Sequence, residues 1–160
     1  MSIVVNSTPL ISLAIINQLD LLPQIFGEVI VPRAVCNEVF IAGKDKQGYT
    51  QLSTARGFCI VDPLNVELKR SIVLQLDEGG AEVITIAKDK NIPLVCIDEF
   101  AGRKYASLLG LNIIGTLGVL LVAKQRGLVS ELKPLCDKLL KSERHISQHL
   151  YAEVLHKAGE

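Results

Sequence analysis

Four side chains with oxygen donors recur where the apolar strands of this chain should end or its helices begin. They are Asn6 in IVVNSTPLISLA, Glu38 in VPRAVCNEVF, Glu82 in LDEGGAEVITIA and Asp98 in IPLVCIDEF. In an α/β fold, the carboxyl ends of parallel strands and the neighbouring helix starts meet in one crevice. Oxygen ligands gathered there suit a hard divalent cation, and such a cation can promote hydrolysis of a phosphodiester. The pattern therefore predicts a metal site made of three carboxylates and one amide.

The elements that must position these side chains alternate between strand and helix. Short apolar runs predict strands over residues 3–5, 28–32, 58–63, 92–97 and 111–115. Apolar periodicity and capping residues predict helices over 9–17, 19–27, from 32 onward, and over 51–57, 67–76, 80–90, 100–109, 116–125, 131–141 and 146–157. This alternation predicts a parallel sheet covered by helices on both faces. We expect one domain over residues 1–160, with the last 30 or so residues forming a helical C-terminal extension.

The composition indicates an aliphatic core and limits how nucleic acid could be attracted. The 160 residues are 49% hydrophobic and 21% charged, with four Phe, three Tyr and no Trp. Seventeen basic and seventeen acidic residues give a net charge of zero. The overall charge therefore does not attract nucleic acid, and binding of RNA or DNA needs a local basic patch or a bound metal.

The cysteines and the start of the chain favour a cytoplasmic protein. The four cysteines form no CxxC pair, and Cys36 and Cys96 lie in apolar runs, so we expect both to be small core residues in a reducing compartment. The chain opens without a charged leader region, and no apolar run reaches the length of a membrane helix. We therefore expect neither a signal peptide nor a membrane span.

From residue 3 to about residue 130, the chain resembles the PIN-domain family, which includes the VapC-like toxin ribonucleases. That family opens with a strand ending in Asp, then Thr or Ser and a helix, and IVVNSTPLI matches this opening with Asn6 in place of the Asp. The family's next three acids match Glu38 in PRAVCNEV, Glu82 in GGAEVITIA and Asp98 in LVCIDE. The run from LDEGG to RGLV looks most like an uncharacterised VapC-related branch.

The resemblance implies a fold, an activity and partners. It implies a three-layer α/β/α sandwich with about five parallel strands, and Mg²⁺- or Mn²⁺-dependent cleavage of RNA to 5′-phosphate products. It also implies a small antitoxin protein that inserts into the site, and a homodimer. Glu38, Glu82 and Asp98 would be catalytic metal ligands, with Asn6 and Glu99 as further ligands. The candidates for substrate binding are Ser7, Thr8, Arg103, Lys104 and Thr116.

The departure at Asn6 leaves two functions open. An amide oxygen can ligate a metal but brings no charge, so metal binding should be weaker than with Asp. The chain is then either a metal-dependent ribonuclease or a PIN fold with little activity that binds protein or RNA. A small nucleotide-binding α/β protein is a third alternative, although the GxGxxG fingerprint and the P-loop lysine are both absent.

Each candidate also has a structural interpretation. Glu82 could favour a helix dipole, Glu38 could lie on a solvated helix face, and Asp98 could cap the helix that starts near Glu99. Ser7 and Thr8 could be helix caps, and Thr116 could belong to a strand-to-helix turn. Arg103 and Lys104 could be surface charges, and the three histidines of the last helical region, His145, His149 and His156, are expected at the surface or an interface.

Overall fold

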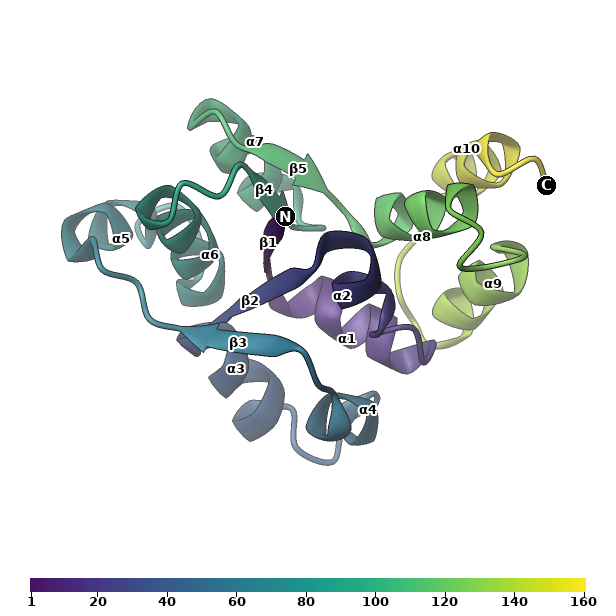
Figure 1. Ribbon diagram of the computed structural model, residues 1–160, viewed down its shortest axis with the longest axis horizontal. Coiled ribbons are helices and arrows are strands. Elements are labelled where there is room, and N and C mark those ends of the chain that lie inside the picture. Colours follow the sequence, from purple (N-terminus) through teal and green to yellow (C-terminus); the bar gives the residue numbers. More distant parts are fainter.

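A five-stranded, all-parallel sheet forms the centre of the molecule, for which the computed structural model describes all 160 residues. The strands are β1 (Ser2–Val5), β2 (Glu28–Pro32), β3 (Phe58–Val61), β4 (Leu94–Cys96) and β5 (Asn112–Ile114). Their order across the sheet is β3-β2-β1-β4-β5 (Figure 1). The chain therefore leaves β1 toward β2 on one side and returns to β4 on the other. Ligands bind at such a switch point, beyond the carboxyl ends of the strands.

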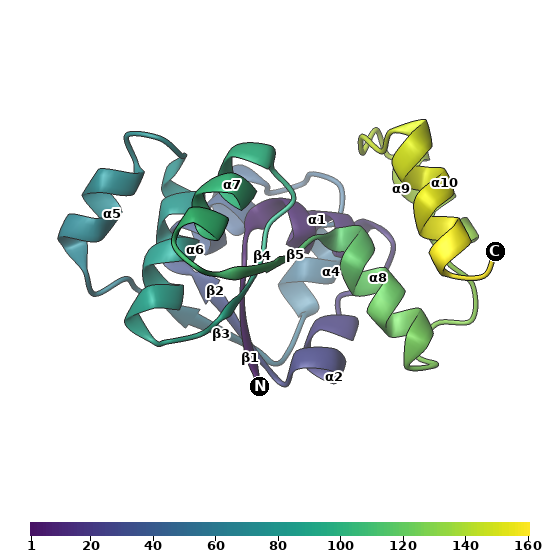
Figure 2. The same cartoon turned by 90° about the horizontal axis from the view of Figure 1, so that it is seen from above.

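Helices cover the sheet on both faces and give the expected three-layer α/β/α fold. Figure 2 shows α5 and α6 on one side of the strands and α1, α2 and α8 on the other. The helices are α1 (Ser7–Ile15), α2 (Leu21–Phe26), α3 (Arg33–Asn37), the π-helical turn η1 (Glu38–Ala42), α4 (Tyr49–Thr54), α5 (Val66–Ile72), α6 (Glu78–Asp89), α7 (Phe100–Leu108), α8 (Thr116–Gln125), α9 (Lys133–Lys141) and α10 (Gln148–Lys157). None of them has the length and apolar character needed to cross a membrane.

Side-chain caps set the starts of two helices that flank the site, and both starts differ from the expected ones. Asn6, and not Ser7 or Thr8, is the N-cap of α1, and its side chain accepts a hydrogen bond from the backbone of Ser7. Asp77 caps α6 by accepting from the N–H of Gly80 at 2.8 Å. Because α6 begins at Glu78 and not at Gly80, Glu82 lies in its second turn and not in its first.

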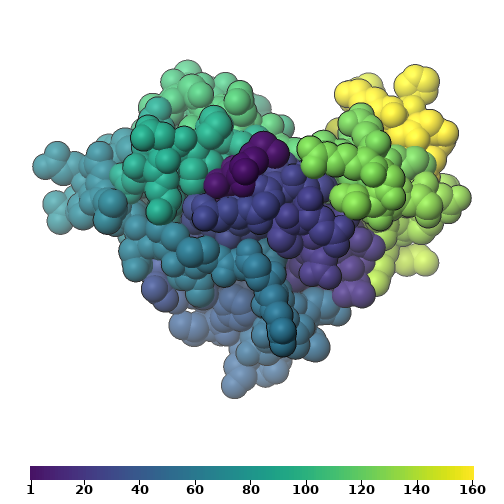
Figure 3. All heavy atoms as spheres, viewed as in Figure 1, coloured from purple at the N-terminus to yellow at the C-terminus, as the bar shows by residue number.

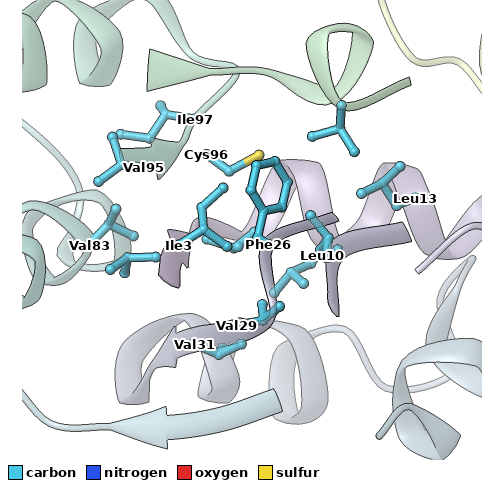
Figure 4. Packing of buried hydrophobic residues seen from close by; sticks show 14 of the residues in the cluster. Ile3, Leu10, Leu13, Phe26, Val29, Val31, Val83, Val95, Cys96 and Ile97 are labelled. Carbon is cyan, nitrogen blue, oxygen red and sulfur yellow. The ribbon is translucent and has the colours of Figure 1, made fainter. Parts of the chain in front are cut away.

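The core is aliphatic, as the composition predicts. It contains 39 buried residues, and Phe26 is its single aromatic member. Figure 4 shows Phe26 among aliphatic side chains that include Ile3 and Leu10. Cys96 is fully buried, and burial raises the pKa of its thiol well above the usual range. Cys36 is only partly buried and packs at the edge of the core, so its expected core position is wrong. The reason is that α3 turns only Val35 fully inward.

The last three helices form a group at one end of the molecule (Figures 1 and 2). The hydroxyl of Tyr151 in α10 donates to Asp137 in α9 at 2.6 Å. The Glu160 carboxylate accepts from the backbone N–H groups of Leu132 and Lys133 at 2.7 and 3.0 Å, and from Lys124 of α8 at 3.1 Å. These bonds hold α8, α9 and α10 together. Figure 3 shows the surface hollowed between this group and the lobe that contains α7 and β5.

Candidate metal centre

The carboxyl ends of three neighbouring strands bring Asn6, Asp98 and Thr116 to one edge of the sheet. Asn6 directly follows β1, and its backbone N–H donates to the carbonyl of Cys96 in β4 at 3.0 Å. Beside it, the N–H of Ile97 donates to the carbonyl of Ile114 in β5 at 3.0 Å. These bonds fix the three strand ends side by side, as the switch-point argument predicts.

Asn6 and Glu38 present oxygens to the same small space above Gly79. A Cβ atom at Gly79 would lie 3.4 Å from Oδ1 of Asn6 and 3.4 Å from Oε2 of Glu38, so these two oxygens are at most about 6.8 Å apart. Asn6 is only 3% exposed. Glu38 is exposed and stands where α3 widens into the π-helical turn, an irregularity that is frequent at functional sites. Glycine at position 79, at the start of α6, leaves this space open.

Asp98 is held rigidly by Thr116. Its Oδ1 accepts from the backbone N–H of Thr116 at 2.8 Å, and its Oδ2 accepts from the Thr116 hydroxyl at 2.6 Å. Asp98 therefore binds the start of α8. It is not the cap of the following helix α7, whose N-cap position is taken by Glu99. Thr116 thus orients one candidate ligand, and its own hydroxyl proton is committed to that ligand.

Arg103 and Asp98 both approach Gly115. A Cβ atom at Gly115 would lie 2.8 Å from Oδ1 of Asp98 and 3.0 Å from Nη1 of Arg103, so a larger residue there would have to displace one of these side chains. The same Nη1 donates to the carbonyl of Ile97 at 2.7 Å. Arg103 and Asp98 line a cavity of about 460 Å³ that extends toward α8 and α10. Lys104 is exposed, and its side chain makes no hydrogen bond.

Glu99 joins a group of four carboxylates. Partial desolvation of its carboxyl raises its pKa, and the negative charges of Asp77, Glu38 and Asp98 raise the pKa further. The charges of these three acids thus act on Glu99, and a cation bound near it would offset that repulsion. Asp77, in the run LDEGG, is a nearby acid that the sequence leaves open, with Glu78, as an extra ligand or a plain exposed charge, and it ranks behind Glu99.

The carboxylate of Glu82 binds Ala34 and Lys69 and does not face the oxygens of Asn6 and Glu38 as a free ligand. Its side chain is 5% exposed, its Oε1 accepts from the N–H of Ala34 at 2.8 Å, and its Oε2 accepts from Nζ of Lys69 at 2.7 Å. Lys69 also binds Glu78 at 3.0 Å. The pKa of Lys69 is raised, mainly by its hydrogen bond to Glu82. Lys69 is a residue that sequence reasoning missed, because nothing local marks a lysine on α5 as the partner of an acid on α6.

The remaining predicted residues surround this group. Ser7 is buried and Thr8 is partly buried at the start of α1. Thr8 lines a second cavity of about 290 Å³ together with Asp98 and Thr116. His145, His149 and His156 are all exposed, as expected.

The donor set suits a hard divalent cation, although the ligands are not drawn together as a complete shell. No group of three or more His, Cys, Asp or Glu side chains is close enough to hold a metal ion. Asn6, Glu38, Asp98 and Glu99 all offer oxygens, which Mg²⁺ and Mn²⁺ prefer. Glu38 and Glu99 are exposed side chains that can rotate toward a cation, whereas Glu82 would first have to leave Lys69.

Comparison with protein-family models identifies the family of this chain. A family model described as a PIN domain matches residues 2–160. The chain belongs to the PIN-domain family. The match includes α9 and α10, beyond the point near residue 130 where the resemblance was expected to end. No curated protein and no solved structure matches the chain. The PIN domain is a nuclease-type fold whose members generally use divalent metal ions.

Proposed function

We propose that this chain is a metal-dependent endoribonuclease that hydrolyses RNA phosphodiesters. One observation carries the proposal. In a chain that belongs to the PIN-domain family, the oxygens of Asn6 and Glu38 converge over Gly79, beside the strand end that carries Asp98 and Glu99. Mg²⁺ or Mn²⁺, when bound, would activate water and offset the charge of the reacting phosphoryl group.

The residues of the chain would then have distinct roles. Asn6, Glu38, Asp98 and Glu99 would hold the metal, and Glu82 would join them if it released Lys69. Thr116 would keep both Asp98 oxygens oriented through its two hydrogen bonds. Arg103, fixed on the carbonyl of Ile97, and Lys104, one residue further along α7, would bind RNA phosphates from the side of α7.

Cleavage of a mixed panel of RNAs in Mg²⁺ and in Mn²⁺ tests this proposal. Glu38→Gln and Asp98→Ala should each lower the cleavage rate by orders of magnitude, because each removes a metal ligand. Glu67→Gln is the matched control, since Glu67 is an exposed glutamate in the first turn of α5 whose carboxylate accepts no hydrogen bond. Equal cleavage by all three variants would refute the assignment of the site.

A PIN fold that binds RNA or protein without cleaving is the second candidate, and two observations favour it. Asn6 replaces a charged ligand by a neutral one, and both oxygens of Glu82 are already bound within the protein. This candidate predicts RNA binding by the wild type without cleavage in either metal. Cleavage gained in Asn6→Asp would then show that the architecture remains and that one charge is missing.

The toxin role and the protein partners are proposals that depend on the same site. A small antitoxin would cover the acidic group, and Phe100, which is 81% exposed and follows Glu99 directly, offers an apolar contact for it. A homodimer is the proposed oligomeric state. Light scattering of the purified chain tests the dimer. Identification of small proteins that co-purify with the chain tests the antitoxin.

A further inference from the structure

A cavity of about 290 Å³ adjoins the candidate metal centre, and Arg103 is not part of its lining. It lies between the carboxyl edge of the sheet and the segment that joins α9 to α10. Its polar walls include Thr8, Ser12, Asp98, Thr116, Arg144 and His145. Asp98 lines both this cavity and the cavity of about 460 Å³ that contains Arg103. The two cavities therefore meet at the residue that carries the central carboxylate.

Arg144 is placed in this cavity by the end of α9. Glu143 adopts a left-handed conformation with φ of 63°, and the N–H groups of Glu143 and Arg144 donate to the carbonyls of Leu140 and Leu139 at 3.2 and 3.0 Å. This pair of bonds is a Schellman motif, which reverses the chain at a helix end in a fixed geometry. The backbone of Arg144 is therefore held in place, although its segment belongs to no helix or strand.

The guanidinium of Arg144 has no partner within the protein. Its Nε is buried and has no hydrogen bond, the single such side-chain atom in the molecule. Arg144 also makes no salt bridge, even with Glu143, which lines the same cavity. A buried donor without an acceptor is unfavourable, and a guanidinium carries five donors suited to an oxyanion. The arrangement favours an anionic ligand with several acceptor oxygens.

We propose that Arg144 binds a phosphate of single-stranded RNA next to the phosphate that is cut. This proposal rests on the proposed ribonuclease function. The strand would pass Arg103 in one cavity, place the reacting phosphate at Asp98, and reach Arg144 in the other cavity. The hydroxyls of Thr8 and Ser12 offer further donors to the same phosphate, as hydroxyl side chains often do in nucleic-acid complexes.

The test measures RNA binding without cleavage. A fluorescent, unstructured RNA ten-mer would be titrated in EDTA by anisotropy at several salt concentrations. Relative to the wild type, Arg144→Gln should weaken binding by about fivefold or more and reduce the slope of log K against log salt by about 0.7. Arg144→Lys should restore part of the affinity, because lysine keeps the charge without the planar set of donors. Arg56→Gln, at an exposed arginine before β3, is the matched control and should change affinity by less than about twofold.

A second series locates the contact. Single phosphates of the RNA would be replaced in turn by neutral methylphosphonates. One replacement should weaken binding to the wild type and have no effect on binding to Arg144→Gln. The proposal is overturned if the wild type binds no RNA or if Arg144→Gln binds RNA as tightly as Arg56→Gln does. It is also overturned if the affinity lost through Arg144→Gln is the same whichever phosphate carries the methylphosphonate. The melting temperature of Arg144→Gln should not fall, because the substitution removes an unpaired buried donor.

The cleavage assay separates this proposal from the one on which it rests. A localised Arg144 contact in a chain that cleaves no RNA in Mg²⁺ or Mn²⁺ would refute the nuclease and retain the phosphate site. Cleavage abolished by Asp98→Ala, together with wild-type RNA affinity in Arg144→Gln, would retain the nuclease and refute the phosphate site.

Discussion

Replacing Asn6 by Asp should make the stability of the protein depend on divalent metal. The substitution puts a negative charge in a position that is 3% exposed and close to Oε2 of Glu38. Two unit charges about 6 Å apart repel by about 3 kcal/mol at an effective dielectric constant of about 20. Solvent around Glu38 reduces this to about 1–2 kcal/mol. A negative charge at the start of α1 offsets about 0.5 kcal/mol of this repulsion, because the N-terminus of a helix carries a partial positive charge.

The net cost in chelator is therefore about 1 kcal/mol, which corresponds to a fall of about 2–4 °C in melting temperature for a chain of this size. Bound metal should reverse the sign of this stability difference between Asn6→Asp and the wild type. A cation present at about 100 times its Kd adds about 2.7 kcal/mol to the stability of the folded state. Asn6→Asp should thus melt below the wild type in EDTA and respond more strongly than the wild type to Mn²⁺.

Differential scanning fluorimetry in EDTA and over a Mn²⁺ series measures both effects, and the RNA cleavage assay is run on the same samples. Asn112→Asp is the matched control, because Asn112 is exposed at the opposite end of the sheet, where β5 begins. If Asn6→Asp shows no larger response to Mn²⁺ than Asn112→Asp, then position 6 is not a metal ligand and the reasoning fails.

Three further predictions concern contacts around the site and the C-terminal helices. Thr116→Val removes one of two hydrogen bonds to Asp98 and should lower the free energy of unfolding by about 1–2 kcal/mol in urea titrations, with a lower cleavage rate than the wild type. Lys69→Met leaves Glu82 buried with one partner and should cost about 2 kcal/mol in the same assay, with Mn²⁺ recovering part of the loss. Tyr151→Phe removes a bond to Asp137, whose pKa is lowered chiefly by Lys133 and then by Tyr151. A lowered pKa in the folded state stabilises the fold at pH values above the unfolded pKa, which is about 3.9 for Asp. The melting temperature of Tyr151→Phe should therefore lie furthest below that of the wild type near pH 7, and the difference should shrink as the pH falls below about 4.

The sequence predicted the sheet and much of the site because both depend on local patterns. Short β-branched runs between polar turns gave all five strands, and Gly115 before Thr116 gave the start of α8. The gathering of Asn6 and Asp98 followed from the rule that parallel strands end at one edge.

The orientation of individual carboxylates could not be predicted in this way. Glu82 lies on the predicted helix, yet its direction is set by the N–H of Ala34 and by Lys69, which come from other segments. The placement of Glu38 depends on a π-helical turn that no local sequence pattern predicts. Arg144 was overlooked because its importance comes from a buried atom without a partner, which only coordinates reveal.

Asn6 and Lys69 change the charge of the site in the same direction. Asn6 omits one negative charge at the end of β1, and Lys69 neutralises another on Glu82. Each reduces the repulsion that the folded chain must tolerate when no cation is bound, and each removes part of the attraction that would draw a cation in. Stability without metal and affinity for metal depend on the same charges. A chain that becomes more stable without metal must therefore lose some of its affinity for metal. The pairing of Lys69 with Glu82 therefore bears on metal affinity as directly as the amide at position 6 does.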